Sequence, residues 1–529
     1  MTASERVPLV EALRLPQTWR LLILGFSAGL PLLLIFSSLS LWLREAGVER
    51  SAVTYFSWAA LGYSFKFVWA PLVDQLPLPW LTRALGSRRS WLVLAQLGVA
   101  TAIFLMGAIN PAGDGLVWMA LAAVLLGFSG ATQDIVIDAY RIECAPPRYQ
   151  ALLSATYIVG YRLAMIVSGA GSLYLAAELG SATDHYDYRA WQMTYWVMAA
   201  VMGLCLLATL CMPEPQRHQP ALRNKGSDYG RFLLLFVLAT GAFASSFFYI
   251  GQSSLDLHAL LGDNPLWRFL TEALRFFLAV GIAAVVVWIA LLLNLVNKPL
   301  VDVTYVAPVR DFFTRYPIKT ALLVLALIGL YRISDIVLGV ISNVFYQDIG
   351  FSKKDIAAAV KAFGVVMSIL GGLLGGALAL RLGVMRILML GAVLSALTNL
   401  LFIGLSLQST IVDVLPINFG FEHDRLWSLY AVVALDNLAA GLASAAFVAF
   451  LSSLVNVSFT AMQYAIFSSM MMLVPKLLGG YSGGMVDQLG YPAFFVATTL
   501  MGLPVIALVW WAGRHLRIES PQPSEPNTL

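Results

Sequence analysis

The sequence predicts an all-α polytopic membrane protein with fourteen transmembrane spans. Of its 529 residues, 59% are hydrophobic and only 12% are charged, and the mean hydropathy is +0.79. These are too few charged residues to cover the surface of a soluble protein of this length. Apolar windows of about 20 residues, the length that crosses a bilayer core, recur along the whole chain. The lysines and arginines gather in every second loop, which is the pattern of membrane topology signals.

The apolar windows form two sets of six with a pair between them. They lie near 21–43, 52–73, 90–109, 116–140, 150–177 and 190–211, then 231–250 and 273–297, and then 318–346, 355–380, 384–408, 427–453, 461–482 and 491–513. We expect an N-terminal six-helix bundle, a linker with two extra transmembrane helices, a C-terminal six-helix bundle and a disordered cytoplasmic tail, at 1–215, 216–300, 301–515 and 516–529. The middle pair has almost no polar residues within its spans, which favours peripheral packing helices over a solute path.

Loop charge predicts the orientation. With both termini in the cytoplasm, 20 of the 33 Lys and Arg residues lie in cytoplasmic segments and 8 in external loops. This excess is the positive-inside pattern of an inner-membrane protein. The first apolar run, Leu21 to Trp42, is too long for a signal peptide and should remain as the first span. The net charge of +4 is dispersed over short loops, so no nucleic-acid partner is expected.

The two sets of six resemble a parallel repeat. Gln150 follows a cytoplasmic turn and is followed 12 residues later by Arg162, and Gln463 and Lys476 repeat this order 13 residues apart. Both cations precede glycine-rich stretches. Parallel six-helix halves around a central site are the architecture of major facilitator transporters. Close helix packing through small residues explains the glycines equally well.

The most informative cluster is Thr132–Arg141, TQDIVIDAYR, on the fourth span. Asp134, Asp138 and Arg141 follow one another at helical spacings of four and three, so they share a face. A partly desolvated carboxylate can bind and release a proton as a cavity opens to either side. A static ion pair that closes a cytoplasmic gate is the alternative. We expect the static pair for Asp138 with Arg141, and proton coupling at Asp134.

Four cations from both sets lie inside predicted spans: Lys66, Arg162, Arg332 and Lys476. A charge at the bilayer centre costs about 3 kcal/mol, so each must be paired or face water. Several cations in one cavity suit an anionic substrate, since guanidinium groups bind carboxylates in pairs. Alternatively, they neutralise Asp134, Asp335 and Asp436. Arg332 and Asp335, three apart on one helix, should form such a pair.

Aromatic residues lie close to these charges in the sequence. Tyr63, Tyr157, Tyr161 and Tyr331 offer a ring with a polar tip, which suits a sugar or amide substrate, although tyrosine is also ordinary in transmembrane packing. Both interpretations remain open.

A second group of charges follows the second span. Asp74 precedes a basic loop that ends in Arg88 and Arg89. A topology signal needs only the arginines, so the carboxylate at the helix end favours a latch that closes the cytoplasmic side.

Nothing in the sequence indicates an enzyme, a metal site or a cofactor. None of the five histidines lies within a predicted span, and no nucleophile–base or paired-carboxylate loop is evident. Cys144, Cys205 and Cys211 show no ligand spacing and are interpreted as small apolar residues. No loop or tail is long enough for the soluble domain that a sensor would need.

Together these motifs resemble the AmpG family of muropeptide permeases, a branch of the major facilitator superfamily. The matching stretches are GFSAGLP at 25–31, YFSWAALGYSFKFVWAPLVD at 55–74, TQDIVIDAYR at 132–141, GYRLAMIVSG at 160–169, APVRDFF at 307–313, YRISD at 331–335, DNLAAGLASAAFVAF at 436–450 and the segment 462–469. The resemblance covers both sets of six spans but not residues 231–297. Asp436 stands where relatives often carry Glu, Lys476 where Arg is usual, and Gln75 where the loop motif has Arg.

The resemblance implies proton-driven import of N-acetylglucosaminyl-1,6-anhydro-N-acetylmuramyl peptides from periplasm to cytoplasm. Such import serves cell-wall recycling and, in many Gram-negative bacteria, β-lactamase induction and hence antibiotic resistance. By similarity, Lys66, Gln133, Asp134, Asp138 and Arg162 are functional. A carrier of another anionic solute, such as acetyl-coenzyme A, is the alternative.

The predicted site therefore has three parts, and the protein is expected to act as a monomer. The proton-coupling residues are Asp134 and Asp138. The gate residues are Asp74, Arg88, Arg89 and Arg141. The substrate-binding residues are Tyr63, Lys66, Gln133, Tyr161, Arg162, Tyr331, Asp335, Asn437, Gln463 and Lys476.

Overall fold

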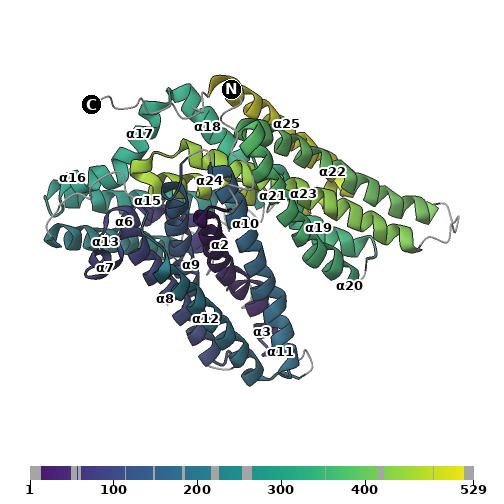
Figure 1. Ribbon diagram of the computed structural model, residues 1–529, viewed down its shortest axis with the longest axis horizontal. Helices are drawn as coiled ribbons and strands as arrows, with labels where there is room; N and C mark the ends of the chain where they lie inside the picture. Colours follow the sequence, from purple (N-terminus) through teal and green to yellow (C-terminus); the bar gives the residue numbers. More distant parts are fainter. Residues whose placement is uncertain are drawn as a thin grey trace. The chain divides into compact units, whose positions relative to one another are not determined.

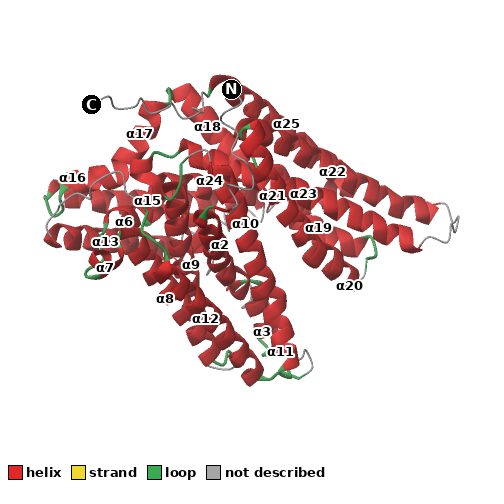
Figure 2. Cartoon of the chain, viewed as in Figure 1, coloured by secondary structure: helices red, strands yellow, loops and turns green. Residues whose placement is uncertain are grey.

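The described chain is built from helices (Figure 2). The computed structural model describes residues 14–48, 56, 61–112, 115–146, 149–181, 185–215, 226–252, 265–351, 353–414, 422–479 and 482–516. Within these residues, 13 helices are long and apolar enough to cross a membrane. They match thirteen of the fourteen predicted spans. The remaining one, 52–73, lies partly outside the described residues and otherwise consists of short pieces.

The N-half, here residues 14–215, contains five long spans and several short helices (Figure 1). The long spans are α2 (Pro16–Ile35) continued by α3 (Ser37–Glu45), α8 (Ser87–Ala108), α9 (Leu116–Glu143), α10 (Gln150–Ile166) continued by the π-helical η6 (Val167–Gly171) and α11 (Ser172–Glu178), and α12 (Tyr188–Cys211). The short pieces are α5 (Leu61–Phe65), the 3-10 helix η3 (Lys66–Val68), α6 (Ala70–Gln75) and α7 (Leu81–Leu85).

The C-half, here residues 318–516, contains the second set of six. Its helices are α18 (Ile318–Leu330), α19 (Ile333–Asp348), α20 (Lys353–Ile356), η8 (Ala357–Phe363), α21 (Gly364–Leu382), α22 (Val384–Val414), α23 (Glu422–Leu454), η9 (Val457–Phe459), α24 (Thr460–Gly479) and α25 (Ser482–His515). α18 and α19 together form one span, as do η8 and α21. The predicted tail lies outside the described residues from 517 onward.

The chain separates into two compact units, and the two halves belong to the same one. The first unit comprises Met1–Val73, Pro77–His218 and Tyr316–Leu529, and the second comprises Asp74–Leu76 and Gln219–Arg315. The second unit holds the two middle helices, α13 (Gly226–Gln252) and α15 (Pro265–Leu292), which pack on each other. It also holds α16 (Lys298–Val301), η7 (Asp302–Val306) and α17 (Ala307–Arg315). Large apolar side chains of α13 and α15 are exposed, as expected for helices that face lipid.

Each half contains one pair of helices that approach backbone to backbone. In the N-half, α2 packs along α10, and a Cβ at Gly25 or Gly160 would overlap a main-chain carbonyl of the opposite helix. In the C-half, α21 packs along α23 in the same way at Gly371 and Gly441 (Figure 1). Apolar helices gain little from the hydrophobic effect inside lipid, so small residues that allow close contact hold them together.

The two halves meet along two sets of helices. α10 packs against α21 and α23, while α9, α5 and η3 pack against α24. At the first of these contacts, Gly376 of α21 lies against Ala151 and Ala155 of α10. The charged cluster of α9 therefore lies on a helix that touches the opposite half.

Gly25→Ala should separate α2 from α10 and destabilise the N-half by about 1–3 kcal/mol, the usual cost of overpacking. The measurement is thermal unfolding in detergent. Gly203→Ala on α12 is the matched control, because no atom lies within 4 Å of its added methyl group, and it should leave the unfolding temperature unchanged or slightly raised. Equal unfolding temperatures for the two variants would contradict the packing argument.

Candidate functional site

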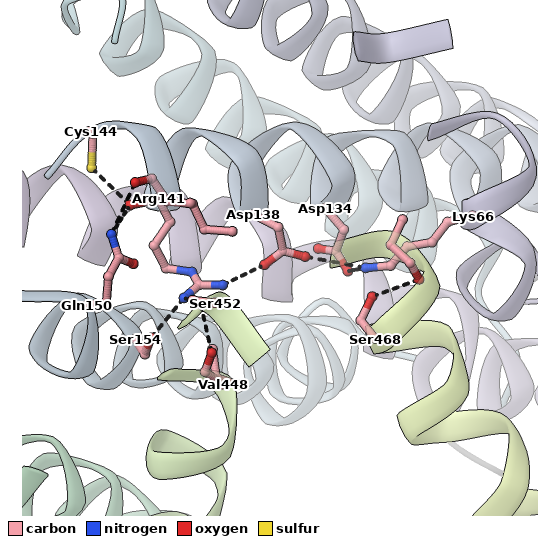
Figure 3. Close-up of polar contacts among 12 residues, drawn as sticks. Lys66, Asp134, Asp138, Arg141, Cys144, Gln150, Ser154, Val448, Ser452 and Ser468 are labelled. Atoms are coloured by element: carbon pink, nitrogen blue, oxygen red, sulfur yellow. Dashed lines mark hydrogen bonds and ion pairs between the residues drawn. The ribbon is translucent and has the colours of Figure 1, made fainter. Parts of the chain in front are cut away.

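Four charged side chains form a continuous chain along α9 (Figure 3). Lys66 Nζ lies 3.8 Å from Asp134 Oδ2 and 3.4 Å from Asp138 Oδ2. The other oxygen of Asp138 accepts from Arg141 Nη2 at 3.4 Å. All four are mostly buried, with side-chain exposures of 13% or less. The predicted pairing of Asp138 with Arg141 is therefore present, and Lys66 joins it to Asp134.

Arg141 carries this chain into the opposite half. Its Nη1 donates to Ser154 of α10 and to Ser452 of α23, both at 2.8 Å. Its guanidinium also lies 5.0 Å from the ring centroid of Tyr464 on α24, within the range of a cation–π interaction. One fully buried side chain thus ties two helices of the C-half to α9.

Asp134 and Asp138 differ in how completely they are engaged. Asp138 lies between two cations, Lys66 and Arg141. Asp134 has only the longer contact to Lys66, and its buried Oδ1 has no hydrogen-bond partner among the described residues. A buried carboxylate whose negative charge is incompletely compensated gains more from binding a proton than one held between two cations. Of the two acids, Asp134 is therefore the better site for a proton. This difference supports a division of roles between the two acids.

A buried uncharged polar cluster lies beside the charged chain. Ser27 Oγ is within 3.3 Å of Gln96 Nε2 and 3.4 Å of Gln133 Nε2. The amide oxygens of both glutamines are buried without a hydrogen-bond partner among the described residues. Gln133, expected to bind substrate, is thus fully buried inside the N-half, and Ser27 and Gln96 were not anticipated.

A second polar junction joins the halves at their predicted cytoplasmic ends. Arg88, at the start of α8, donates from Nε and Nη2 to the two oxygens of Glu143 at 3.0 and 2.6 Å. Nη2 also donates to Thr460 of the C-half at 2.9 Å, and the Thr460 hydroxyl donates to Glu143. Arg88 and Glu143 have side-chain exposures of 2% and 1%. We call Arg88, Glu143 and Thr460 the cytoplasmic latch.

Arg89, predicted as a gate residue, makes its described contacts within the N-half. Its side chain donates to the carbonyl of Leu210, within the N-half. Its backbone NH and that of Arg88 both donate to Glu214, which caps the first turn of α8. Gly86 permits this because its φ of +91° suits glycine and a Cβ there would strike the Glu214 side chain. Arg89 thus holds the N-half together, and its described contacts do not reach the C-half.

Arg162 is the cation that stands apart. It lies on α10, the helix that packs on the C-half. Its one side-chain contact in the described part of the chain is from Nη1 to the sulfur of Met165 at 3.9 Å, and no described carboxylate pairs with it. Arg332 of the C-half is close enough to repel its charge. Two guanidinium groups from opposite halves that repel one another favour the binding of an anion near them.

The C-half carries its own ion pair. Arg332, between α18 and α19, pairs with Asp335 at 3.3 Å, as predicted, and donates to Ser444 at 2.7 Å. Asp436 of α23 accepts from Thr398 at 3.3 Å.

The four tyrosines divide into two groups. Tyr331 is buried, donates to the carbonyl of Leu388 and stacks on Phe447 at 4.3 Å, so packing accounts for it. Tyr63, Tyr157 and Tyr161 are half-buried around the charged chain, with the last two in ring contact at 6.1 Å. These three remain candidates for a sugar-facing wall.

The remaining predicted residues are less informative. Gln463 accepts a hydrogen bond from the backbone NH of Asn456, in the turn that precedes α24. Gln150 donates to three backbone carbonyls of the turn that precedes α10. Each glutamine therefore stabilises the turn before its own helix. Asn437 donates to Val433 one turn back on α23. The side chain of Lys476 lies outside the described residues. Asp74 is buried at the end of α6.

Sequence analysis did not identify Glu143 and Thr460, because their residue types and positions near the ends of predicted spans are ordinary. Glu143 is the last residue of α9 and Thr460 is the first residue of α24, and they lie 317 residues apart in the sequence. Neither is unusual at a membrane boundary.

Comparisons with known proteins agree with this architecture. A model of the Major Facilitator Superfamily matches residues 21–330 and 321–528. An anhydromuropeptide permease of Escherichia coli is 29% identical over 93% of this chain and 79% of its own length, and a transporter named AmpG 4 from Rickettsia conorii is 28% identical over 94% and 97%. Two solved structures share the fold. The proton:xylose symporter XylE matches with a TM-score of 0.54 at 13% identity, over 94% of this chain and 94% of its own. The transporter FucP, solved in the outward conformation, matches with a TM-score of 0.55 at 11% identity, over 94% of this chain and 99% of its own.

Glu143→Gln should loosen the cytoplasmic latch, because removing one partner of a buried pair costs about 3–5 kcal/mol. Cys144, the next residue, reports this. Burial raises the pKa of its thiol to about 12, so the reactive thiolate is scarce near neutral pH and maleimide labelling is slow. Removing the Glu143 charge slightly lowers the pKa of Cys144 by itself, and opening lowers it much further towards its ordinary value, because burial is the largest cause of the shift. Each unit of decrease speeds labelling by about tenfold.

The labelling is measured in a Cys211→Ser background, since Cys211 is exposed whereas Cys205 is buried. Glu178→Gln, an exposed carboxylate at the end of α11, is the control. A folded Glu143→Gln variant that labels at the rate of the parent would show that the latch does not hold this end closed.

Proposed function

Because the chain belongs to the major facilitator superfamily, we propose that it is an inner-membrane carrier that imports anhydromuropeptides together with protons. The observation that carries the proposal is Arg162, a cation inside a membrane span without an anionic partner among the described residues. Such a charge costs about 3 kcal/mol or more unless water or a ligand meets it. The substrate class follows from the relatives, which include an anhydromuropeptide permease.

The substrate's chemistry matches the residues that the two halves offer. A muropeptide joins a disaccharide to a peptide that ends in carboxylates. Arg162 would bind a peptide carboxylate, since a planar guanidinium group binds a carboxylate through two parallel hydrogen bonds, and the anion would relieve the repulsion between Arg162 and Arg332. Tyr63, Tyr157 and Tyr161 would face the sugars with rings that combine an apolar face and a polar tip.

Proton coupling is assigned to Asp134. When it is ionised, Lys66 and Arg141 balance Asp134 and Asp138 in charge. When Asp134 binds a proton, Asp138 becomes the only anionic partner of Lys66 within this cluster, and the cluster gains a net positive charge. Because Arg141 connects the same cluster to Ser452 and Tyr464, a change of charge there acts on the contact between the halves. Alternating access then consists of breaking the cytoplasmic latch and the Arg141 contacts, with both termini in the cytoplasm.

The transport test uses radiolabelled anhydromuropeptide and proteoliposomes with an inward proton gradient. The parent should accumulate label, and a protonophore should abolish accumulation. Asp134→Asn should lose accumulation yet retain substrate exchange, because its binding groups are intact. Asp311→Asn, at a half-buried residue paired with Arg315 outside the proposed site, should behave as the parent.

Two results would refute this function. One is accumulation that persists after the proton gradient has collapsed. The other is uptake of acetyl-coenzyme A, with no uptake of muropeptide, into the same vesicles.

Arg162→Gln should weaken muropeptide binding by about 10–100-fold, the worth of one charge-assisted hydrogen bond of about 1.5–3 kcal/mol. Isothermal titration measures it. The affinity for the same muropeptide with its peptide carboxylates converted to neutral amides should not change, because that ligand offers Arg162 no peptide carboxylate. Arg310→Gln, which breaks an exposed pair with Asp302, is the control. An equal loss of affinity for both ligands would show that Arg162 does not bind the peptide carboxylate.

A further inference from the structure

The C-half holds one cation among two carboxylates. Arg332 pairs with Asp335 at 3.3 Å, and Asp436 interacts electrostatically with both of them. The three come from different elements, since Arg332 precedes α19, Asp335 lies in its first turn and Asp436 lies on α23. We call these three residues the C-half acid site.

The charges of this site do not balance. In the N-half, Lys66 and Arg141 match Asp134 and Asp138 one for one. In the C-half, an ionised Asp335 and an ionised Asp436 leave a net charge of −1 within membrane-spanning helices. Uncompensated charge in such surroundings is costly, so the site needs one further positive charge.

Among the described side chains, the groups around Asp436 do not supply that charge; the side chain of Lys476, on the neighbouring helix α24, lies outside them. Thr398 of α22 donates a hydrogen bond to it, and Tyr346 of α19 faces it with a neutral phenol. Arg332 is already committed to Asp335 and Ser444. Arg162 acts on Arg332 by repulsion and not on either acid.

The surrounding hydroxyl groups also indicate an incompletely satisfied site. Ser395 of α22 is 7% exposed, and its hydroxyl faces the carboxylate of Asp335. It nevertheless completes no hydrogen bond within the described residues. A buried hydroxyl that can turn towards an acid serves either protonation state of the site, since it can donate or accept.

We propose that Asp436 is a second proton-binding carboxyl group of this carrier, separate from Asp134 and located in the C-half. A proton on Asp436 removes the excess negative charge, and Arg332 with Asp335 is then a neutral pair. Arg162 remains as the excess cation opposite them, so an anion binds most tightly when Asp436 carries its proton. This deepens the proposed function, on which it rests for its coupling to transport.

The test is infrared difference spectroscopy of the purified full-length protein, titrated between about pH 5 and 9 without substrate. Protonated carboxyl groups absorb separately from carboxylates. The parent should show a carboxylic-acid band that titrates, and Asp436→Asn should lose one such component while Asp134→Asn loses another. Asp436→Glu, which keeps the carboxyl group, should retain the component at a shifted position.

The outcomes are distinct. A band unchanged in a folded Asp436→Asn variant would overturn the proposal, because Asp436 would then be ionised throughout. A band that is absent in the parent and appears in Arg162→Gln or in Lys476→Gln would also overturn it, by showing that the substituted cation supplies the missing charge. Since no substrate is present, a mistaken substrate assignment cannot produce either result.

The link to binding is tested separately by measuring muropeptide affinity against pH. The parent should bind more weakly as pH rises from about 6 to about 8. Asp436→Asn should keep the low-pH affinity throughout, because its amide mimics the protonated acid, while Asp311→Asn should follow the parent. An affinity that falls equally in Asp436→Asn would contradict the link. Absence of muropeptide binding by the parent would refute the proposed function and leave the infrared result standing.

Discussion

Every charge within a membrane-spanning helix of this protein must be paired or reached by water, and this constraint organises the first unit. Lys66, Asp134, Asp138 and Arg141 satisfy it by forming one chain along α9. The chain ends at Arg141, whose Nη1 donates to serines of α10 and α23. Arg141 thus both balances the charge of Asp138 in the N-half and contacts the C-half. A change of protonation in this cluster therefore acts on a side chain that holds the two halves together.

The described polar contacts between the halves gather at their predicted cytoplasmic ends. Arg141 with Ser452 and the latch of Arg88, Glu143 and Thr460 are both there. Arg162 and Arg332 have the opposite character, since they come from different halves and repel. The halves thus attract each other at one end and repel each other deeper in the spans. An anionic solute would remove this repulsion by neutralising the charges of Arg162 and Arg332.

The span pattern and the spacing of Asp134, Asp138 and Arg141 could be predicted from sequence because helical periodicity and bilayer length leave few alternatives. The pairing of Arg332 with Asp335 followed from the same rule. The partners of Arg88 could not be predicted, since Thr460 lies 372 residues away and only tertiary packing brings it near. Tyr331 and Gln463 were expected at the substrate, yet the hydroxyl of Tyr331 and the amide oxygen of Gln463 are bonded to backbone groups. Residue type indicated that these side chains needed partners but not which ones.

The glycine contacts of α2 with α10 and of α21 with α23 determine where the molecule can deform. Surfaces that meet main chain to main chain resist sliding, because a shift of a fraction of an ångström brings carbonyls into collision. Polar contacts, by contrast, can exchange one partner for water at little cost. Each half should therefore move as a rigid body. The interactions that change during a transport cycle are then mainly those of the few side chains that connect the two halves.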